Sequence, residues 1–303
     1  MNVRLDGKVA IVTGSGRGLG LAFAKAMAKA GASVVINDVD ATVAHAAVDA
    51  VKAEGGAAVA EVVPVGTADA ADRLVSRALD SFGRLDILCA NAGIVRDRVL
   101  WNMSDEEFDL VIRTHLHGTF TCVRAAVKHM RAKGEGGRIL LVSSIAGQRG
   151  NFGQTNYAAA KAGIAAMART WAIECARAQI TVNAIVPVAM TAMLATIPAL
   201  TEVVEAAQRG EPIPEKMRRL GFGSADDVAP LLVFLASDAA RAVSGQCIGI
   251  GGDKLALWSH PQEVATAFRD GGWSAEAIAS AWSTTVGREL QSYGDELPKD
   301  LTT

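Results

Sequence analysis

Short apolar runs alternate with longer amphipathic segments along most of the chain. The runs have the length of buried β-strands and lie at 8–13, 33–38, 57–63, 85–90, 138–143, 179–185 and 246–250. Between them, apolar residues recur at helical spacing and predict helices over 18–30, 41–54, 69–82, 105–133, 155–178 and 225–236. Strands that alternate with helices form parallel sheets covered on both faces. We therefore expect an α/β fold with one doubly wound parallel sheet.

The connection over 186–223 departs from this alternation. It holds several prolines and a series of apolar residues: Pro187, Pro198, Pro212, Pro214, Met190, Met193, Leu194, Ile197, Met217, Leu220 and Phe222. Connections of this length inside a compact domain usually have a function. We expect a loop that covers an apolar substrate, with an ordinary packed excursion as the alternative.

The tail is the second departure. We assign residues 1–252 to the sheet domain and residues 253–303 to a helical C-terminal extension packed on the same domain. Helices are expected around 261–269 and 274–283, with Trp258, Trp273 and Trp282 as anchors.

Composition narrows the function classes. The chain has 303 residues, half of them hydrophobic, and a net charge of −2. Such a balance gives no electrostatic footprint for nucleic acid. No apolar run is long enough to span a bilayer, and a signal peptide is not evident, so we expect a cytoplasmic protein. The cysteines at 89, 122, 175 and 247 are far apart in sequence and are expected to be reduced and mostly buried.

Histidines 115 and 117 do not predict a metal site. Two residues that are two positions apart on a helix point about 200° away from each other and cannot share an ion. We expect no metal.

A glycine-rich loop follows the first strand and opens into the first helix. Its residues are Gly14, Gly16, Arg17, Gly18, Leu19 and Gly20. Glycines let the backbone approach a pyrophosphate, and a helix N-terminus supplies amide donors to it. Asp38 ends the second strand, where a Rossmann-type unit has the acidic residue that binds the adenine ribose. Its charge repels a 2′-phosphate, so NAD is the expected cofactor, although Arg17 is a cation that could accept one.

The glycine spacing and several later motifs resemble the short-chain dehydrogenase/reductase family over almost the whole chain. Asn91-Ala92-Gly93 ends the fourth strand, and Ser144, Tyr157 and Lys161 reproduce the family's serine and YxxxK arrangement. The resemblance implies a single Rossmann-type domain, a nicotinamide cofactor and a homodimer or homotetramer. It also implies cofactor contacts from Val65, Asn91, Ala92, Gly93, Tyr157, Lys161, Pro187, Val188 and Thr191. Val188 stands where the family usually has glycine.

The chemistry of this motif explains its spacing. Tyr157 and Lys161 are one helical turn apart, so their side chains leave the same face of a helix. A phenol has an ordinary pKa of about 10, and we expect the neighbouring ammonium and the oxidised nicotinamide to lower it. Tyr157 then exchanges a proton with the substrate while Ser144 donates a hydrogen bond to the substrate oxygen.

His115 stands where the family has a catalytic asparagine, and two readings remain open, a proton relay and an ordinary packed residue. With Gly150-Asn-Phe-Gly-Gln154 and the tail from Trp273 to Trp282, it resembles the (3R)-hydroxyacyl-CoA dehydrogenase subgroup found in peroxisomal multifunctional enzyme type 2.

We therefore expect an NAD-dependent dehydrogenase of a 3-hydroxyacyl-CoA. The alternatives are a steroid or alicyclic alcohol dehydrogenase, an NADPH-dependent 3-oxoacyl reductase, and a cofactor-sensing protein on the same fold. The expected partner is a small apolar molecule, acyl-CoA or steroid-like. Cations that could meet the phosphates of coenzyme A are Arg96, Arg98, Arg209, Lys216, Arg218 and Arg219.

Overall fold

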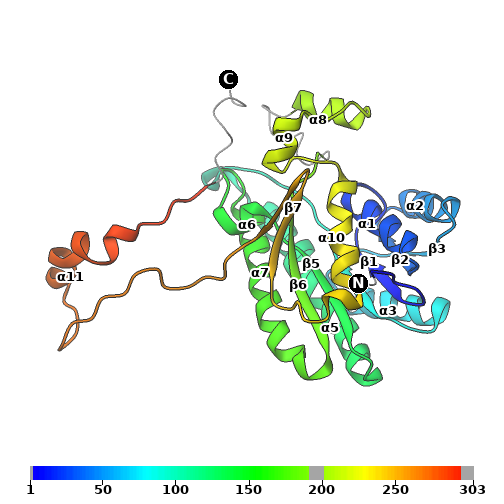
Figure 1. The fold of residues 1–303 in the computed structure, drawn as a ribbon, viewed down its shortest axis with the longest axis horizontal. Helices are drawn as coiled ribbons and strands as arrows, with labels where there is room; N and C mark the ends of the chain where they lie inside the picture. Colours follow the sequence, from blue (N-terminus) through cyan, green and yellow to red (C-terminus); the bar gives the residue numbers. More distant parts are fainter. Residues whose placement is uncertain (1–2, 191–200, 295–303) are drawn as a thin grey trace.

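The computed structural model describes residues 3–190 and 201–294. In this part of the chain one sheet has the strand order β3-β2-β1-β4-β5-β6-β7-β8 (Figure 1). All neighbours are parallel except β7 and β8. The strands are β1 Val9–Val12, β2 Ser33–Asp38, β3 Ala57–Val62, β4 Ile87–Ala90, β5 Gly137–Val142, β6 Ile180–Pro187, β7 Cys247–Gly251 and β8 Lys254–Leu257. The doubly wound sheet expected from the sequence is confirmed.

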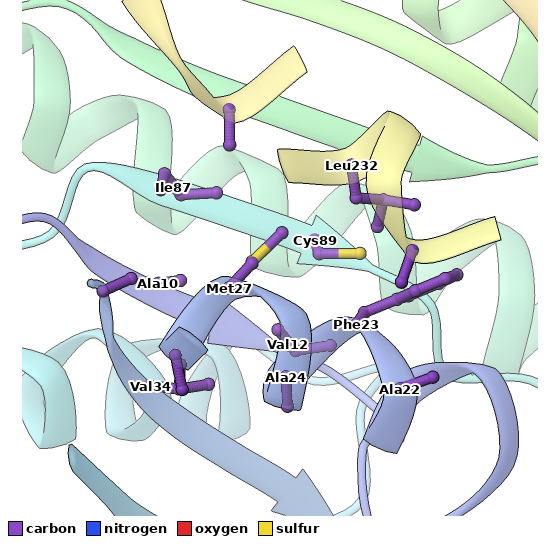
Figure 2. Close-up of a cluster of buried hydrophobic side chains, with 14 of the residues drawn as sticks. Ala10, Val12, Ala22, Phe23, Ala24, Met27, Val34, Ile87, Cys89 and Leu232 are labelled. Carbon is purple, nitrogen blue, oxygen red and sulfur yellow. The ribbon is translucent and has the colours of Figure 1, made fainter. Parts of the chain in front are cut away.

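Helices cover both faces of this sheet. They are α1 Gly18–Lys29, α2 Ala41–Ala53, α3 Ala68–Phe82, α5 Gly118–Lys133, α7 Thr155–Cys175 and α10 Ala225–Ala236. The side chains of β1 alternate between the faces, since Ala10 and Val12 join one buried cluster and Val9 and Ile11 join the other. The first cluster receives Phe23 and Met27 of α1 and Leu232 of α10 (Figure 2). The second receives residues of α3, α5 and α7.

The long helix expected over 105–133 is interrupted. It consists of α4 Asp105–Ile112, a π-helical turn Arg113–His117, and α5. Ser104 and Glu107 form a capping box at its start. A π turn contains one residue more than an α-helical turn, so it changes which residues face the sheet. His115 lies in this turn and is buried.

The connection after β6 is partly helical in the residues that the structure describes. It contains α8 Thr201–Gln208 and α9 Glu215–Leu220. A small apolar cluster, the loop cluster, holds it together and consists of Met190, Val204, Met217 and Phe222. Expected wall residues Met193, Leu194 and Ile197 lie outside the described residues.

The C-terminal extension differs from expectation in three ways. Strand β8 was not predicted, and the helix predicted around 261–269 is absent; most residues of this segment are exposed, so no packing surface stabilises a helix there. The helix expected over 274–283 is present as α11 Ala275–Ala281, followed by 3₁₀ turns at Trp282–Thr284 and Val286–Glu289. Residues 254–258 pack on the sheet domain through β8 and Trp258, whereas the following residues 259–291 project from it (Figure 1).

A search of the described residues for a helix both long and apolar enough to cross a bilayer finds none.

Candidate active site

The glycine loop forms where β1 ends and α1 begins. Gly14 has φ +61° and lies so close to Ala92 that a Cβ at Gly14 would be 2.7 Å from the Ala92 Cα. A Cβ at Gly20 would lie 2.2 Å from the Gly14 carbonyl oxygen. Gly18 faces open space, and the side chain of the N-cap residue Arg17 does not cap α1. The first amides of α1 are therefore available to an anion such as a pyrophosphate.

Asp38 lies against this loop, at the carboxyl end of β2. The Gly16 amide donates to Asp38 Oδ2 over 3.2 Å, and the Asp40 amide donates to Oδ1 over 3.2 Å. A Cβ at Gly16 would lie 2.6 Å from Oδ2, so only glycine lets the loop approach the carboxylate so closely. The structure places Asp38 beside the glycine loop as predicted. Arg17, which follows Gly16 in the loop, is exposed to solvent.

The segment Asn91-Ala92-Gly93 follows β4 and is hydrogen-bonded to the start of the glycine loop. Thr13 Oγ1 accepts hydrogen bonds from the amides of Asn91 and Ala92, at 3.0 and 3.1 Å. The Asn91 side chain donates to the carbonyls of Thr13 and Gly14, each over 3.0 Å. Asn91 therefore orders the loop. Val65, the other predicted contact on this side, packs against Gly118 at the start of α5.

Ser144, Tyr157 and Lys161 come from two elements that pack together. Ser144 caps the short helix α6 Ile145–Arg149, and its Oγ accepts from the Ala146 amide over 3.2 Å. Tyr157 and Lys161 lie one turn apart on α7, and both are buried. Lys161 Nζ is 5.5 Å from the centroid of the Tyr157 ring and donates to the Val142 carbonyl over 2.6 Å. The structure brings the three predicted residues together.

Burial sets the pKa values of this pair. It raises the pKa of Tyr157 to about 12, against a smaller lowering by a side-chain hydrogen bond with Ser144. It lowers the pKa of Lys161 to about 7. In the chain alone, burial therefore outweighs any lowering of the Tyr157 pKa, and the lowering expected with the oxidised nicotinamide bound stays a prediction. Removal from water disfavours both charged forms, and a lysine with a pKa near 7 is only partly charged near neutrality.

His115 lies between the cofactor loop and Tyr157. Its ring meets the Tyr157 ring edge-on, with centroids 5.2 Å apart. Its Nε2 lies 2.6 Å from the Ile94 carbonyl oxygen and 3.0 Å from the Ile94 amide nitrogen. The shorter separation requires a proton between the two atoms, which assigns the hydrogen to Nε2. Nδ1 is then a buried acceptor with no hydrogen-bond partner among the described residues.

Burial lowers the pKa of His115 to about 3, so the ring is neutral near pH 7. Gly93 is required beside it, because a Cβ there would lie 2.1 Å from the His115 Cε1. Close contacts thus run without a break from Gly14 through Ala92 and Gly93 to His115 and Tyr157. The glycine loop and Tyr157 therefore belong to one site.

Asn156 also builds the site, although no sequence motif pointed to it. Its Nδ2 donates to the carbonyls of Arg96 and Glu107, at 3.0 and 3.2 Å. Its Oδ1 accepts from the Tyr157 amide over 2.7 Å. The side chain is fully buried and fixes the start of α7 against α4. An asparagine before a tyrosine is too common a pair to be noticed without these partners.

The far wall of the site begins at the end of β6. The Val188 amide donates to the Ile250 carbonyl over 2.9 Å, which continues the pairing of β6 with β7 beyond Pro187. Thr191 lies outside the described residues. Met190 belongs to the loop cluster, so its side chain is packed within the connection.

Most of the cations proposed to meet coenzyme A are paired with carboxylates. Arg218 donates to Asp227 Oδ1 and Oδ2, each over 3.1 Å, and to Asp253 Oδ1. These hydrogen bonds raise the pKa of Arg218 and join α9 to α10 and to the β7–β8 turn. Arg218 is therefore engaged with two carboxylates, and its expected contact with a coenzyme A phosphate stays a prediction. Three others form exposed ion pairs, Arg219 with Glu215, Arg209 with Glu211 and Arg98 with Glu107.

Residues 14–252 match the family model described as enoyl-(acyl carrier protein) reductase. A 3-oxoacyl-[acyl-carrier-protein] reductase of Synechocystis is 41% identical over 250 residues, which are 82% of this chain and 97% of the relative. The hydroxyacyl-CoA dehydrogenase ChsB1 of Mycobacterium tuberculosis is 42% identical over 299 residues, 94% of this chain and 90% of the relative.

Two further matches extend into the C-terminal region. Peroxisomal multifunctional enzyme type 2 of Mus musculus is 37% identical over 290 residues, which are 92% of this chain but only 37% of that enzyme. A short chain dehydrogenase from Mycobacterium avium has a crystal structure that superposes with a TM-score of 0.82 at 35% identity, covering 96% of this chain and 99% of that one. The chain therefore belongs to the short-chain dehydrogenase/reductase family and is an oxidoreductase that acts on hydroxyl and keto groups.

Proposed function

We propose that the chain interconverts a 3-hydroxyacyl-CoA and its 3-oxo form with NAD as the hydride carrier. The contact path from the glycine loop to Tyr157 carries the proposal, because it puts a dinucleotide-binding loop and a proton-transfer group in one site. The residues present fit the cofactor, since α1 is uncapped at its N-terminus and a carboxylate adjoins the loop. The amides near Gly16 and Gly18 would hold the pyrophosphate, and Asp38 the adenine ribose.

A nicotinamide cofactor bound at this site would supply the hydride chemistry that interconverts the alcohol and the ketone. During oxidation the Tyr157 oxygen takes the proton of the substrate hydroxyl, and during reduction it gives that proton back. Lys161, with its pKa near 7, is able to take up or release a proton beside it. Ser144 donates a hydrogen bond to the substrate oxygen, where negative charge develops.

His115 is proposed to take the place of the family's asparagine as a positioning residue. Its neutral ring holds the Ile94 backbone on one side and contacts Tyr157 on the other. The unpartnered Nδ1 is an acceptor suited to a water molecule in a proton relay. His115→Asn keeps an acceptor and should retain most of the turnover, whereas His115→Leu should lower kcat and change its pH profile. An unchanged pH profile in His115→Leu would assign the ring to packing alone.

The assignment to a CoA thioester rests on two relatives that are named for hydroxyacyl-CoA or contain such a unit, and on the apolar loop cluster. Arg96 is the cation best placed to assist, since among the described residues its guanidinium donates only to the neighbouring Val95 carbonyl. Arg96→Glu should therefore raise KM for a CoA thioester with little change in kcat, because remote phosphate contacts contribute uniform binding.

The test is NADH formation from a matched panel: a 3-hydroxyacyl-CoA, the corresponding free 3-hydroxy acid, and an alicyclic alcohol. We expect the thioester to give the highest kcat/KM and to lose the most as salt rises. Equal values for thioester and free acid would contradict the CoA assignment, and a preference for the alicyclic alcohol would replace it with the steroid-like class.

A 3-oxoacyl reductase that uses NADPH is the second candidate, favoured by the name of the Synechocystis relative. Comparing kcat/KM for NAD and NADP in both directions separates the two. A tenfold or greater preference for NADP would favour this reductase and contradict the assigned role of Asp38.

A further inference from the structure

The loop over residues 63–66, here called the β3 loop, lies beside the residue expected to hold the adenine ribose. Asp38 ends β2 and pairs in register with Val62, the last residue of β3. The β3 loop therefore leaves the sheet at the carboxyl end of the strands, next to Asp38. Dinucleotides bind outside the carboxyl ends of the strands in sheets of this kind. The β3 loop thus borders the adenine side of the site.

Asn37 ties the β3 loop to the glycine loop. Its Nδ2 donates to the carbonyls of Glu61 and Val63, over 3.1 and 2.9 Å. Its Oδ1 accepts from the Gly14 amide over 3.4 Å, and its own amide donates to Ser15 Oγ over 3.0 Å. The Asn37 side chain is buried. One side of the β3 loop is therefore fixed to the segment expected to hold the pyrophosphate.

The π turn supports the other side of the β3 loop. His117 Nδ1 lies 2.8 Å from the Gly66 carbonyl oxygen. A carbonyl oxygen only accepts, so the ring donates from Nδ1. A Cβ at Gly66 would lie 3.3 Å from the Arg113 carbonyl oxygen, and a Cβ at Gly118 would lie 2.9 Å from Val65 Cγ2. The β3 loop therefore contacts both ends of the π turn.

Neighbouring side chains orient the His117 ring. The Phe120 ring lies tilted against it, with centroids 6.1 Å apart. The Arg124 guanidinium lies over the Phe120 ring, 4.8 Å from its centroid. These three side chains are three and four positions apart along the helix and so share one face. A ring held in this way loses little further rotamer freedom when it donates to Gly66.

We propose that His117 is a positioning residue for the adenine half of the cofactor. Its hydrogen bond to Gly66 sets how far the β3 loop, and Val65 within it, stands from the glycine loop. The inference rests on the proposed nucleotide cofactor. His115, two positions earlier, meets Ile94 and Tyr157. One turn thus supports the adenine side through His117 and the reacting side through His115.

The hydrogen bond from His117 is the part of this support that a single substitution removes. The residue is exposed apart from the contacts described, so replacing it leaves no cavity in the core. The net contribution of one hydrogen bond corresponds to a change of about two- to tenfold in affinity. A cofactor that must reorder the β3 loop on binding loses affinity by this factor. The chemical step is unaffected, because the loss is the same in the ground state and the transition state.

ADP-ribose tests the adenine side without turnover, because it carries the adenosine and pyrophosphate parts of NAD and no nicotinamide. We expect His117→Ala to raise the Kd of ADP-ribose about two- to tenfold in isothermal titration calorimetry. The KM for NAD should rise by a similar factor, while kcat at saturating NAD stays at the wild-type value. His117→Asn should restore most of the affinity, because its amide offers a donor close to the backbone.

His260→Ala is the matched control. Its Nε2 bonds the Gly245 carbonyl oxygen over 2.9 Å, just before β7 begins. The amino end of β7 is at the opposite edge of the sheet from the glycine loop. The variant removes the same kind of hydrogen bond and should leave the Kd of ADP-ribose unchanged.

Gly66→Ala disturbs the same contact from the other partner. Gly66 has φ +111°, and a Cβ there would press on the Arg113 carbonyl oxygen. We expect a raised Kd of ADP-ribose, and in the double variant with His117→Ala a rise smaller than the product of the two single effects. A rise equal to that product would mean that His117 does not act through Gly66, and would overturn the proposal.

Three further results would overturn it. An unchanged Kd of ADP-ribose in His117→Ala would remove the residue from cofactor binding. A fall in kcat at saturating NAD would mean that His117 supports the reacting side of the site. An affinity of His117→Asn as low as that of His117→Ala would assign the effect to packing on Phe120. If wild-type protein itself does not bind ADP-ribose, the proposed nucleotide cofactor fails, which is seen before any variant is compared.

Discussion

The glycine-loop region after β1 and the connection after β6 are held together differently. Around the loop, backbone groups bond to Thr13, Asn91 and Asp38, and glycines allow contacts that no Cβ would permit. In the connection, the loop cluster and the Arg218 ion pairs hold α8 and α9 through side chains. A region fixed by its backbone presents the same surface to every cofactor molecule. A region fixed by side chains is altered by single substitutions, which suits the part that selects substrates.

The largest expected effect comes from Tyr157, which is linked to the glycine loop through His115, Gly93 and Ala92. Tyr157→Phe removes one hydroxyl and few packing contacts, so kcat should fall about 10²–10⁴-fold. Cofactor affinity and Tm should stay close to wild-type values. Stopped-flow or steady-state NADH absorbance measures kcat, and a cofactor fluorescence titration measures the cofactor affinity. Turnover near the wild-type rate would remove Tyr157 from the mechanism.

The second largest effect is expected from the Asp38 carboxylate, which lies against the glycine loop. Asp38→Ser should lower the ratio of kcat/KM for NAD to that for NADP by about ten- to a hundredfold, because a charged hydrogen-bond acceptor is lost and a repulsive charge with it. Met217→Leu, a volume-conserving change in the loop cluster, should alter KM for the substrate and leave the cofactor ratio unchanged. If the ratio of kcat/KM for NAD to that for NADP changed equally in both variants, the glycine-loop region and the connection would not differ in their effect on cofactor choice.

The pH dependence of stability tests the burial of Lys161. Its pKa is about 7 in the folded chain and near 10.5 when exposed, so the unfolded chain binds more protons between these values. The free energy of unfolding should therefore rise with pH from about 7 to 10, by up to about 1.4 kcal/mol per pH unit from this group. Lys161→Met should flatten this rise in urea titrations at several pH values. An equally steep rise in the variant would assign it to other groups.

The smallest effect concerns the connection itself. Arg218→Met leaves Asp227 and Asp253 without their shared cation, so Tm should fall. Arg219→Met removes an exposed pair with Glu215 and should leave Tm nearly unchanged, as is usual for such pairs. Differential scanning calorimetry compares the two. Equal Tm values would mean that the loop cluster alone holds α9.

The sequence predicted the parts of the site in which neighbouring residues carry the information. The glycine loop is contiguous, Asp38 ends a recognisable strand, and Tyr157 and Lys161 are four positions apart. It failed where the decisive partner is distant: Arg218 meets Asp253 across 35 positions, and His115 meets Ile94 across 21. The direction of the Tyr157 pKa also depends on how many atoms exclude water, which no motif records.

The extension illustrates the same limit. Its apolar residues and α11 follow from composition and spacing, but the path of residues 259–274 depends on what surface receives them. Trp273 and Trp282 were expected to anchor it to the domain and instead remain partly exposed. A side chain that looks like a core anchor in sequence also fits a surface that meets another molecule.

The π turn at Arg113–His117 makes the helix before it and the helix after it out of phase. One residue added within a helix rotates everything beyond it by about 100°. Removing a single residue there would restore continuous α-helical winding and would turn either α4 or α5 to the wrong face. His115 would no longer meet both Ile94 and Tyr157, although every residue of the catalytic motif would still be present. In this stretch, then, the active site depends on the number of residues in the helix as much as on their identity.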